Sequence, residues 1–166
     1  MIADPPQYDE PERTPPFLDL VAATPSPSRV IVRDRNTNPT VLFDIPVRSE
    51  DNDEMIYYAL HVNYTFPDHN NYVAFGRLPA GTFDETGRAI QIDWDARRIG
   101  VGAPRGCYQL TLLVAHESSW DYTLQRPNPT LGIGDTAVAT WWLNLDPRAE
   151  SPDTLDDCPN ASEVEQ

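Results

Sequence analysis

The stretch Gly106-Cys-Tyr-Gln-Leu-Thr-Leu-Leu-Val-Ala-His116 indicates the fold class of this chain. From Tyr108 onward every second residue is apolar, and a strand with one buried face requires this period of two. The apolar series is Tyr108, Leu110, Leu112 and Val114. We therefore expect residues 106–116 to form a central strand whose apolar face covers the core.

Other segments alternate in the same way. Strands are expected over residues 17–22, 29–33, 41–48, 55–65, 72–75, 88–94 and 136–145, with loops over 76–87 and 117–135. No segment shows a sustained period of 3.6 residues, so an all-β domain is expected. Pro46 lacks an amide donor, which predicts a sheet edge or a β-bulge at that point.

The alternation also predicts which side chains face the core. The expected inward sets are Phe43, Ile45 and Val47; Tyr58, Leu60, Val62 and Tyr64; Ile90, Ile92 and Trp94; and Ala139, Trp141, Leu143 and Leu145. The opposite face of the strand at 55–65 carries Tyr57, Ala59, His61 and Asn63.

The start of the central strand resembles strand F of an immunoglobulin-like or fibronectin-III-like β-sandwich. In that family a Gly turn feeds a Tyr that begins the strand and hydrogen-bonds back to the preceding corner. Tyr108 would be that corner tyrosine. The resemblance implies an immunoglobulin-like antiparallel β-sandwich of about seven to nine strands over residues 17–146. The strand at 55–65 lacks the Trp that immunoglobulin domains usually carry there, which favours a fibronectin-like or cadherin-like relative.

Composition predicts one domain with two tails. The 166 residues are 40% hydrophobic, which suffices for one ordinary core. Residues 1–16 hold five prolines and almost nothing apolar, so we expect a disordered Pro-rich tether there, and residues 147–166 read as an acidic C-terminal tail. The net charge of −14 disfavours nucleic acid and anionic lipid as partners. All twelve basic residues are Arg, which excludes Schiff-base and lysine-base mechanisms.

The N-terminal stretch Met1-Ile-Ala-Asp-Pro-Pro-Gln-Tyr-Asp-Glu-Pro-Glu-Arg-Thr-Pro-Pro16 is similar to the mature start of a bacterial lipoprotein. The resemblance implies that Met1 stands where an acylated Cys would be. It also implies a location in the cell envelope, either anchored to the outer membrane, periplasmic or surface-exposed. No run approaches the roughly 18 apolar residues of a membrane span. Membrane contact is therefore expected only through a lipid anchor upstream of residue 2. The alternative is a disordered N-terminus of a soluble protein.

The chain has two cysteines, Cys107 and Cys158. In the sandwich family the core disulfide uses a position two residues past the corner tyrosine. Here that position is Leu110, so the family's core bridge is absent. A bridge between Cys107 and Cys158 would pin the tail over the sheet, and closing a loop of about 50 residues would stabilise the fold by about 4 kcal/mol. Export to an oxidising compartment would favour this bridge, and the alternative is two free thiols.

No catalytic motif is present. The stretch His116-Glu-Ser-Ser-Trp120 imitates half of a zinc-protease motif, but Trp120 replaces the second His and the context is a strand end. Asp68-His69 is a carboxylate–imidazole pair with no nucleophile motif nearby. We expect a non-enzymatic domain without a cofactor or a metal site. A hydrolase is the alternative, because carboxylate pairs have no local signature, and it would need a cleft beside a His.

Acidic side chains gather in the loops that meet at one end of such a sandwich. They are Asp51, Asp53 and Glu54; Asp84 and Glu85; and Glu117 and Asp121. Clustered oxygen ligands suit Ca²⁺, whereas dispersed carboxylates form a solvated acidic surface. We interpret these loop carboxylates as a solvated acidic surface.

The loop at 117–135 carries the binding residues that we expect. Trp120 and Tyr122 lie beside Glu117 and Asp121, and exposed aromatic residues with polar neighbours stack on sugars or anchor a protein partner. Alternatively, the loop folds back and buries Trp120. Trp142 faces away from the core, either under the tail or as part of a second exposed patch.

The expected function is a non-enzymatic binding or structural accessory domain of an envelope lipoprotein that contacts a protein partner through its loops. The alternative is a carbohydrate-binding module that uses Trp120, Tyr122 and Trp142.

Overall fold

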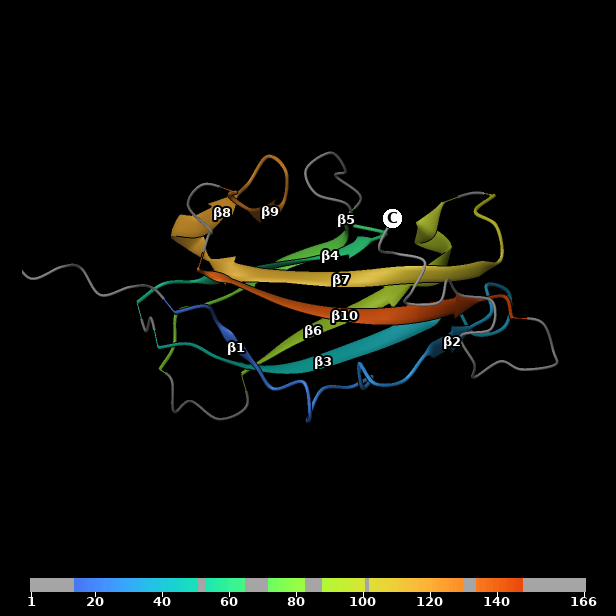
Figure 1. Cartoon of the computed structure of the whole chain (residues 1–166), viewed down its shortest axis with the longest axis horizontal. Coiled ribbons are helices and arrows are strands. Elements are labelled where there is room, and N and C mark those ends of the chain that lie inside the picture. Colours follow the sequence, from blue (N-terminus) through green and yellow to red (C-terminus); the bar gives the residue numbers. More distant parts are fainter. Residues whose placement is uncertain are drawn as a thin grey trace, which may run out of the picture.

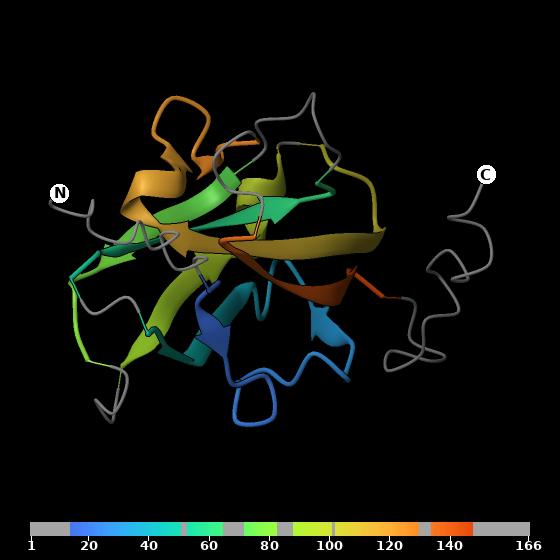
Figure 2. The same ribbon diagram turned by 60° about the vertical axis from the view of Figure 1, so that its left-hand side comes forward.

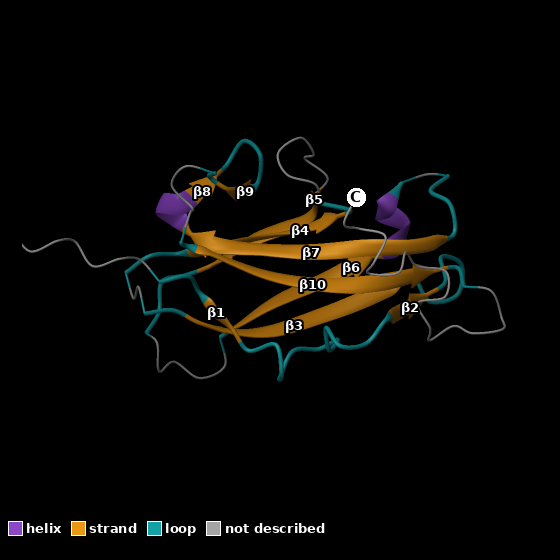
Figure 3. Ribbon diagram, in the orientation of Figure 1, coloured by secondary structure: helices purple, strands orange, loops and turns teal. Residues whose placement is uncertain are grey.

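The computed structural model describes residues 14–50, 53–64, 72–82, 88–100, 102–129 and 134–147. Its strands are β1 (Phe17–Leu18), β2 (Ile31–Arg33), β3 (Thr40–Arg48), β4 (Ile56–Val62), β5 (Tyr72–Leu78), β6 (Ala89–Asp95), β7 (Gly106–His116), β8 (Trp120–Asp121), β9 (Arg126–Pro127) and β10 (Thr136–Leu145). Two short 3-10 helices, η1 (Ala96–Ile99) and η2 (Glu117–Ser119), lie toward opposite ends of the long axis (Figure 3). The all-β class predicted from the alternation is confirmed.

The strands form two main sheets (Figure 1). One has the order β1-β3-β6 and the other the order β2-β10-β7-β4-β5, and β8 and β9 form a separate small ribbon. The parallel pair between β2 and β10 differs from the antiparallel arrangement that we expected, whereas the other pairs are antiparallel. The first main sheet lies below the second in Figure 1, and the ribbon lies on the far side of the second.

The core lies between the two sheets, and the predicted inward series line it, except that Tyr64 is outside the core and its ring lies against His61 of the outer face. The buried members of its cluster include Val41, Phe43, Ile45, Val47, Ile56, Leu60, Val62, Ile90, Ile92, Trp94, Tyr108, Leu110, Leu112, Val114, Ala139, Trp141, Leu143 and Leu145. Trp141 of β10 packs edge-to-face on Phe43 of β3 with ring centroids 5.1 Å apart. Its indole nitrogen donates to the Pro25 carbonyl at 2.8 Å, so this buried ring keeps its one polar group satisfied.

The stretch quoted first is the central strand of the larger sheet. β7 pairs with β10 on one side and with β4 on the other. The Tyr108 hydroxyl donates to the Pro104 carbonyl at 2.6 Å, which confirms the predicted hydrogen bond back to the corner. This bond fixes the chain where it enters β7.

Pro46 lies in the middle strand of its sheet, which is neither of the two positions that we expected. The Asp44 N–H bonds the Thr24 carbonyl on one side of β3, and the Val47 N–H bonds the Arg88 carbonyl on the other. Because donors alternate along a strand, position 46 faces the same side as Asp44. On that side the Asp19 N–H donates to the Pro46 carbonyl at 3.0 Å, and β1 ends at Leu18, so the missing donor comes at the point where this ladder ends.

Three other segments differ from expectation. β1 has two residues instead of six, because the Asp19 carboxylate accepts the Ala22 N–H at 3.1 Å and turns the chain out of the sheet. β5 continues to Leu78, into the predicted loop at 76–87, with Gly76 lying against the ring of Tyr58. The predicted loop at 117–135 contains η2, β8 and β9.

The ends of the chain fall outside the described residues. This applies to most of the predicted tether, to almost all of the predicted tail and to Cys158. Cys107 is half-buried on β7, opposite Asn144 in register, and its bridge to Cys158 stays a prediction. No helix among the described residues has the length and hydropathy needed to cross a bilayer.

Candidate binding surface

Residues 117–127 fold back over the outer face of the five-stranded sheet (Figure 2). Trp120 is 5% exposed and packs on Ala59 of β4 and Ala115 of β7. The ring of Tyr57 stacks on it with centroids 6.0 Å apart. Of the two interpretations of Trp120, the one in which the loop buries it therefore holds, and its role is to fasten this segment to the sheet.

The turn between β8 and β9 presents Tyr122 to solvent. The Asp121 carboxylate accepts the backbone N–H groups of Thr123 at 2.8 Å and Leu124 at 3.1 Å, so it shapes this turn. Tyr122 is 51% exposed, and its hydroxyl donates to Glu117 at 3.1 Å. Partial burial, together with hydrogen bonding to Tyr57 and Glu117, raises the pKa of Tyr122. Tyr122 and Glu117 therefore lie in contact, as predicted. The Asp121 carboxylate instead holds the turn through its hydrogen bonds to the backbone.

Side chains of β5 continue this surface. Residues directly opposite each other share one face of a sheet, and the register pairs Tyr57 with Arg77 and His61 with Tyr72. A bulge beside His61 brings Tyr72 onto the outer face with Phe75. Tyr72 is 38% exposed and Phe75 59%, and their rings meet edge-on at 5.5 Å.

We call Tyr57, Tyr72, Phe75, Arg77, Glu117 and Tyr122 the outer aromatic surface. Tyr57 joins its two halves, because its ring meets Tyr122 edge-on at 5.3 Å and its hydroxyl accepts from Arg77 at 3.4 Å. No sequence pattern marked Tyr72 or Phe75 as binding residues. Strict alternation would put Tyr72 and Phe75 on opposite faces, and only the bulge in β5 brings both to the face of Tyr57. Which part of that face stays uncovered depends on where residues 117–127 settle.

The remaining predicted residues lie elsewhere. Trp142 is half-buried on the outer face of β10, opposite Gln109 near the start of β7, whereas Trp120 lies beyond the end of that strand. Asp51, Asp84 and Glu85 lie outside the described residues. Glu54 accepts from the Ser118 hydroxyl at 2.6 Å. In the described part of the chain, no three His, Cys, Asp or Glu side chains are placed to hold a metal ion.

His61 is buried on the outer face of β4. Its ring meets those of Tyr64 and Tyr72 at centroid distances of 5.0 and 6.5 Å. In the described part of the chain, neither ring nitrogen has a partner within hydrogen-bonding geometry. Burial, the largest cause, lowers the pKa of His61 to about 4, with the nearby Gln125 carbonyl opposing this shift and the charge of Arg126 adding to it. The imidazole is therefore neutral at pH 7.

Ser49, His116 and Asp135 form a buried chain of hydrogen bonds. The Ser49 hydroxyl lies 2.5 Å from His116 Nε2, and His116 Nδ1 lies 2.5 Å from the Asp135 carboxylate. This is the order of nucleophile, base and orienting acid in serine hydrolases. The three residues are 3%, 0% and 1% exposed, however, so the hydroxyl offers a substrate almost no access.

These hydrogen bonds hold the segment after β3 and the segment before β10 against the end of β7. A hollow of about 200 Å³ reaches Ser49 from the surface beside Phe17 and Glu50, which keeps the hydrolase alternative open to test. From the sequence, His116 was half of a zinc-protease motif and one of three histidines, with His61 and His69, that a hydrolase cleft could use. Ser49 and Asp135 are 67 and 19 residues from His116 in sequence, so no local sequence pattern predicts these contacts.

No protein-family model matches this chain, and no curated protein or solved structure matches it significantly.

Proposed function

We propose that this chain is a non-enzymatic binding domain with an immunoglobulin-like β-sandwich fold, and that it binds a protein partner through the outer aromatic surface. The observation that carries the binding proposal is the exposure of Tyr72, Phe75 and Tyr122, at 38%, 59% and 51%, on one side of one sheet. Grouped exposed aromatic side chains mark interaction sites, because they bury large area at low cost in conformational entropy.

The strand order supports the immunoglobulin-like assignment. In such sandwiches strands A, B and E form one sheet, and strands C, F and G form the other. The sheet β1-β3-β6 corresponds to the first set, and β10-β7-β4 in the larger sheet corresponds to the second. The hydrogen bond from Tyr108 to the Pro104 carbonyl supports the same assignment, because it has the form of the family's tyrosine corner.

Ring geometry favours a protein over a glycan. The planes of Tyr57 and Tyr122 are inclined by 88°, and those of Tyr72 and Phe75 by 90°. Neither pair forms the flat platform on which a sugar ring stacks. Arg77 and Glu117 flank the rings with both signs of charge, as in the polar rim of a protein interface. A carbohydrate-binding module is the alternative function.

We also propose that the domain belongs to an envelope lipoprotein. This rests on the Pro-rich composition of residues 1–16 and on the net charge of −14, which suits a protein held near a membrane by a lipid and not by basic side chains. The test is the intact mass of the N-terminal peptide from the native cell. A diacylglyceryl-modified Cys in place of Met1 is expected, and an unmodified Met1 in the soluble fraction would overturn the proposal.

The binding proposal is tested by crosslinking the wild-type domain to isolated envelope fractions and identifying the captured proteins. The double variant Phe75→Ala/Tyr122→Ala should lose the specific partner. The matched control is Leu42→Ala, which removes an exposed apolar side chain, 64% exposed, from the other sheet and should leave capture unchanged. Equal capture by all three proteins would refute the proposal, and loss of binding to a polysaccharide panel in the double variant would favour the glycan alternative.

A further inference from the structure

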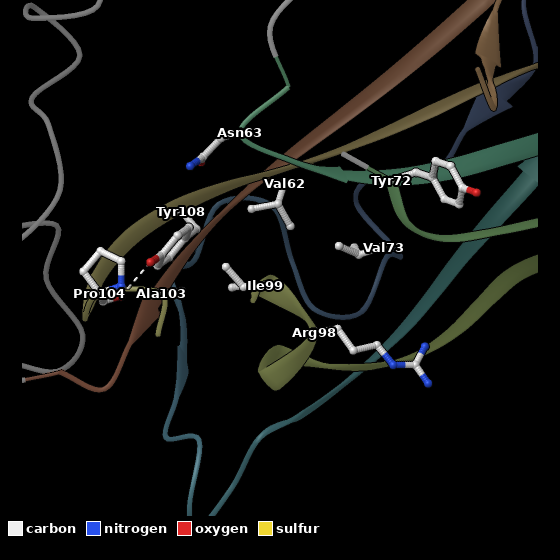
Figure 4. Close-up of a pocket in the computed structure, with 9 residues that line it drawn as sticks. All are labelled: Val62, Asn63, Tyr72, Val73, Arg98, Ile99, Ala103, Pro104 and Tyr108. Carbon is white, nitrogen blue, oxygen red and sulfur yellow. Dashed lines mark hydrogen bonds between the residues drawn. The ribbon is translucent and has the colours of Figure 1, made fainter. Parts of the chain in front are cut away.

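A pocket opens beside η1 (Figure 4). Its volume of about 440 Å³ falls within the usual range for small-molecule sites. β4, β5, η1 and the approach to β7 supply its walls. Figure 4 shows Val62, Val73 and Ile99 in its middle, between a rim with Asn63 and Tyr108 and a rim with Tyr72 and Arg98.

The middle of the pocket continues the hydrophobic core. Val62 belongs to the buried core cluster, and Val73, Ile99 and Ala103 pack against it. The bulge in β5 that turns Tyr72 outward leaves Val73 facing the core side. An apolar group in this pocket would therefore contact side chains that already exclude water on their other side.

Arg98 supplies a positive charge at the rim. It is exposed and has no ion pair or hydrogen bond with any described residue, whereas its neighbour Arg97 is paired with Asp95. Arg98 acts on Asp95 only at longer range. A guanidinium presents a planar fork of donors that matches a carboxylate.

A second polar residue lies at the opposite rim. The Asn63 side-chain oxygen accepts the Gln109 N–H at 2.9 Å. That bond fixes the amide and leaves its NH₂ group as a donor with no partner among the described residues. Arg98 and Asn63 therefore place donor groups at the two rims of the pocket, on either side of its apolar middle.

We propose that this pocket binds a small organic carboxylate with an apolar body, the carboxylate at Arg98 and the body against Val62, Val73 and Ile99. The apolar middle disfavours inorganic anions, which would gain nothing from it. The net charge of −14 disfavours multiply charged ligands, so a monoanion fits best. This site is separate from the proposed partner-binding surface, apart from Tyr72 at its rim.

The test is a titration of the ¹⁵N-labelled domain with octanoate, and with octanol as the uncharged analogue, at near-physiological salt. Octanoate should shift the amide resonances of Val62, Val73, Ile99 and Ala103 in a saturable way. Arg98→Gln should weaken octanoate binding about tenfold, the effect of losing one charge-assisted contact. Arg97→Gln is the matched control, because it removes the same charge one residue away and should change the affinity less than about twofold.

Several outcomes would overturn the proposal. They are equal weakening by the two Arg variants, octanol binding as tight as octanoate binding, or saturable shifts confined to other residues. Absence of any saturable shift also overturns it. Melting temperatures of both variants accompany the titration, since neither exposed Arg should affect stability. Phe75 and Tyr122 are unchanged in this experiment, so its failure would leave the proposed partner-binding surface untouched.

Discussion

His61 should make the stability of this domain sensitive to mild acid, and replacing it should remove that sensitivity. The imidazole lies beside Gln125 and Arg126, is 0% exposed, and neither of its nitrogens has a hydrogen-bond partner among the described residues. Burial holds its pKa at about 4 in the folded protein, against 6.5 for a free side chain. A group that binds its proton more tightly after unfolding favours the unfolded chain as the pH falls.

The magnitude follows from this difference in pKa. The stabilising effect of a neutral His61 is complete above the unfolded pKa of 6.5 and is lost progressively as the pH falls toward about 4. The full loss is about 3 kcal/mol, and about 2 kcal/mol of it falls between pH 7 and pH 5. Against a stability of about 5–15 kcal/mol for a typical domain, this is a large fraction.

The assay is urea unfolding at pH 7 and pH 5 for the wild type and for His61→Leu. Leu keeps the apolar contacts with the two tyrosines and has no nitrogen to protonate. Carboxylates and other groups titrate in both proteins, so the difference between the two pH dependences isolates His61. We expect the wild type to lose about 2 kcal/mol more than the variant. His69→Gln, which removes a histidine outside the described residues, is the control and should behave as the wild type. The reasoning is refuted if His61→Leu shows the same loss of stability as the wild type.

Three further predictions concern stability and chemistry. Tyr108→Phe should lower the free energy of unfolding by about 1 kcal/mol, seen as a lower urea midpoint at unchanged m, because the hydrogen bond to the Pro104 carbonyl is lost. Gly76→Ala should cost about 1–3 kcal/mol by thermal melting, because the added methyl group would overlap the ring of Tyr58; an unchanged melting temperature would show that this ring moves freely. A fluorophosphonate probe should not label Ser49 in the folded protein, because that residue is only 3% exposed, and a mass shift on its peptide would instead support the hydrolase alternative.

Much of the sheet was predictable from alternation. β7 and β10 run over the residues predicted for them, and their inward side chains are buried as expected. The corner tyrosine was also predictable, because Tyr108 bonds a carbonyl only four residues away. Each of these features depends on a local pattern, which a single sequence displays directly.

The binding surface was predicted in part. Tyr122 and Glu117 are close in sequence and were expected together, and the structure brings them into contact. Tyr72 and Phe75 join them only because β5 pairs with β4 through a bulge. Trp120 was a candidate for exposure, but it is buried. The sequence could not decide between the two, because an aromatic residue in a loop does not show whether a face of the sheet is free to receive it.

The all-β class, the extents of the strongest strands and the apolar face of each can be read from the sequence, because these features follow from a period of two in the order of the residues. Only the tertiary structure decided which outer faces are covered, that Ser49, His116 and Asp135 meet, and that a pocket opens beside Arg98. These features join segments tens of residues apart, and the contacts that select them form only when the two sheets pack and the connecting segments settle on them.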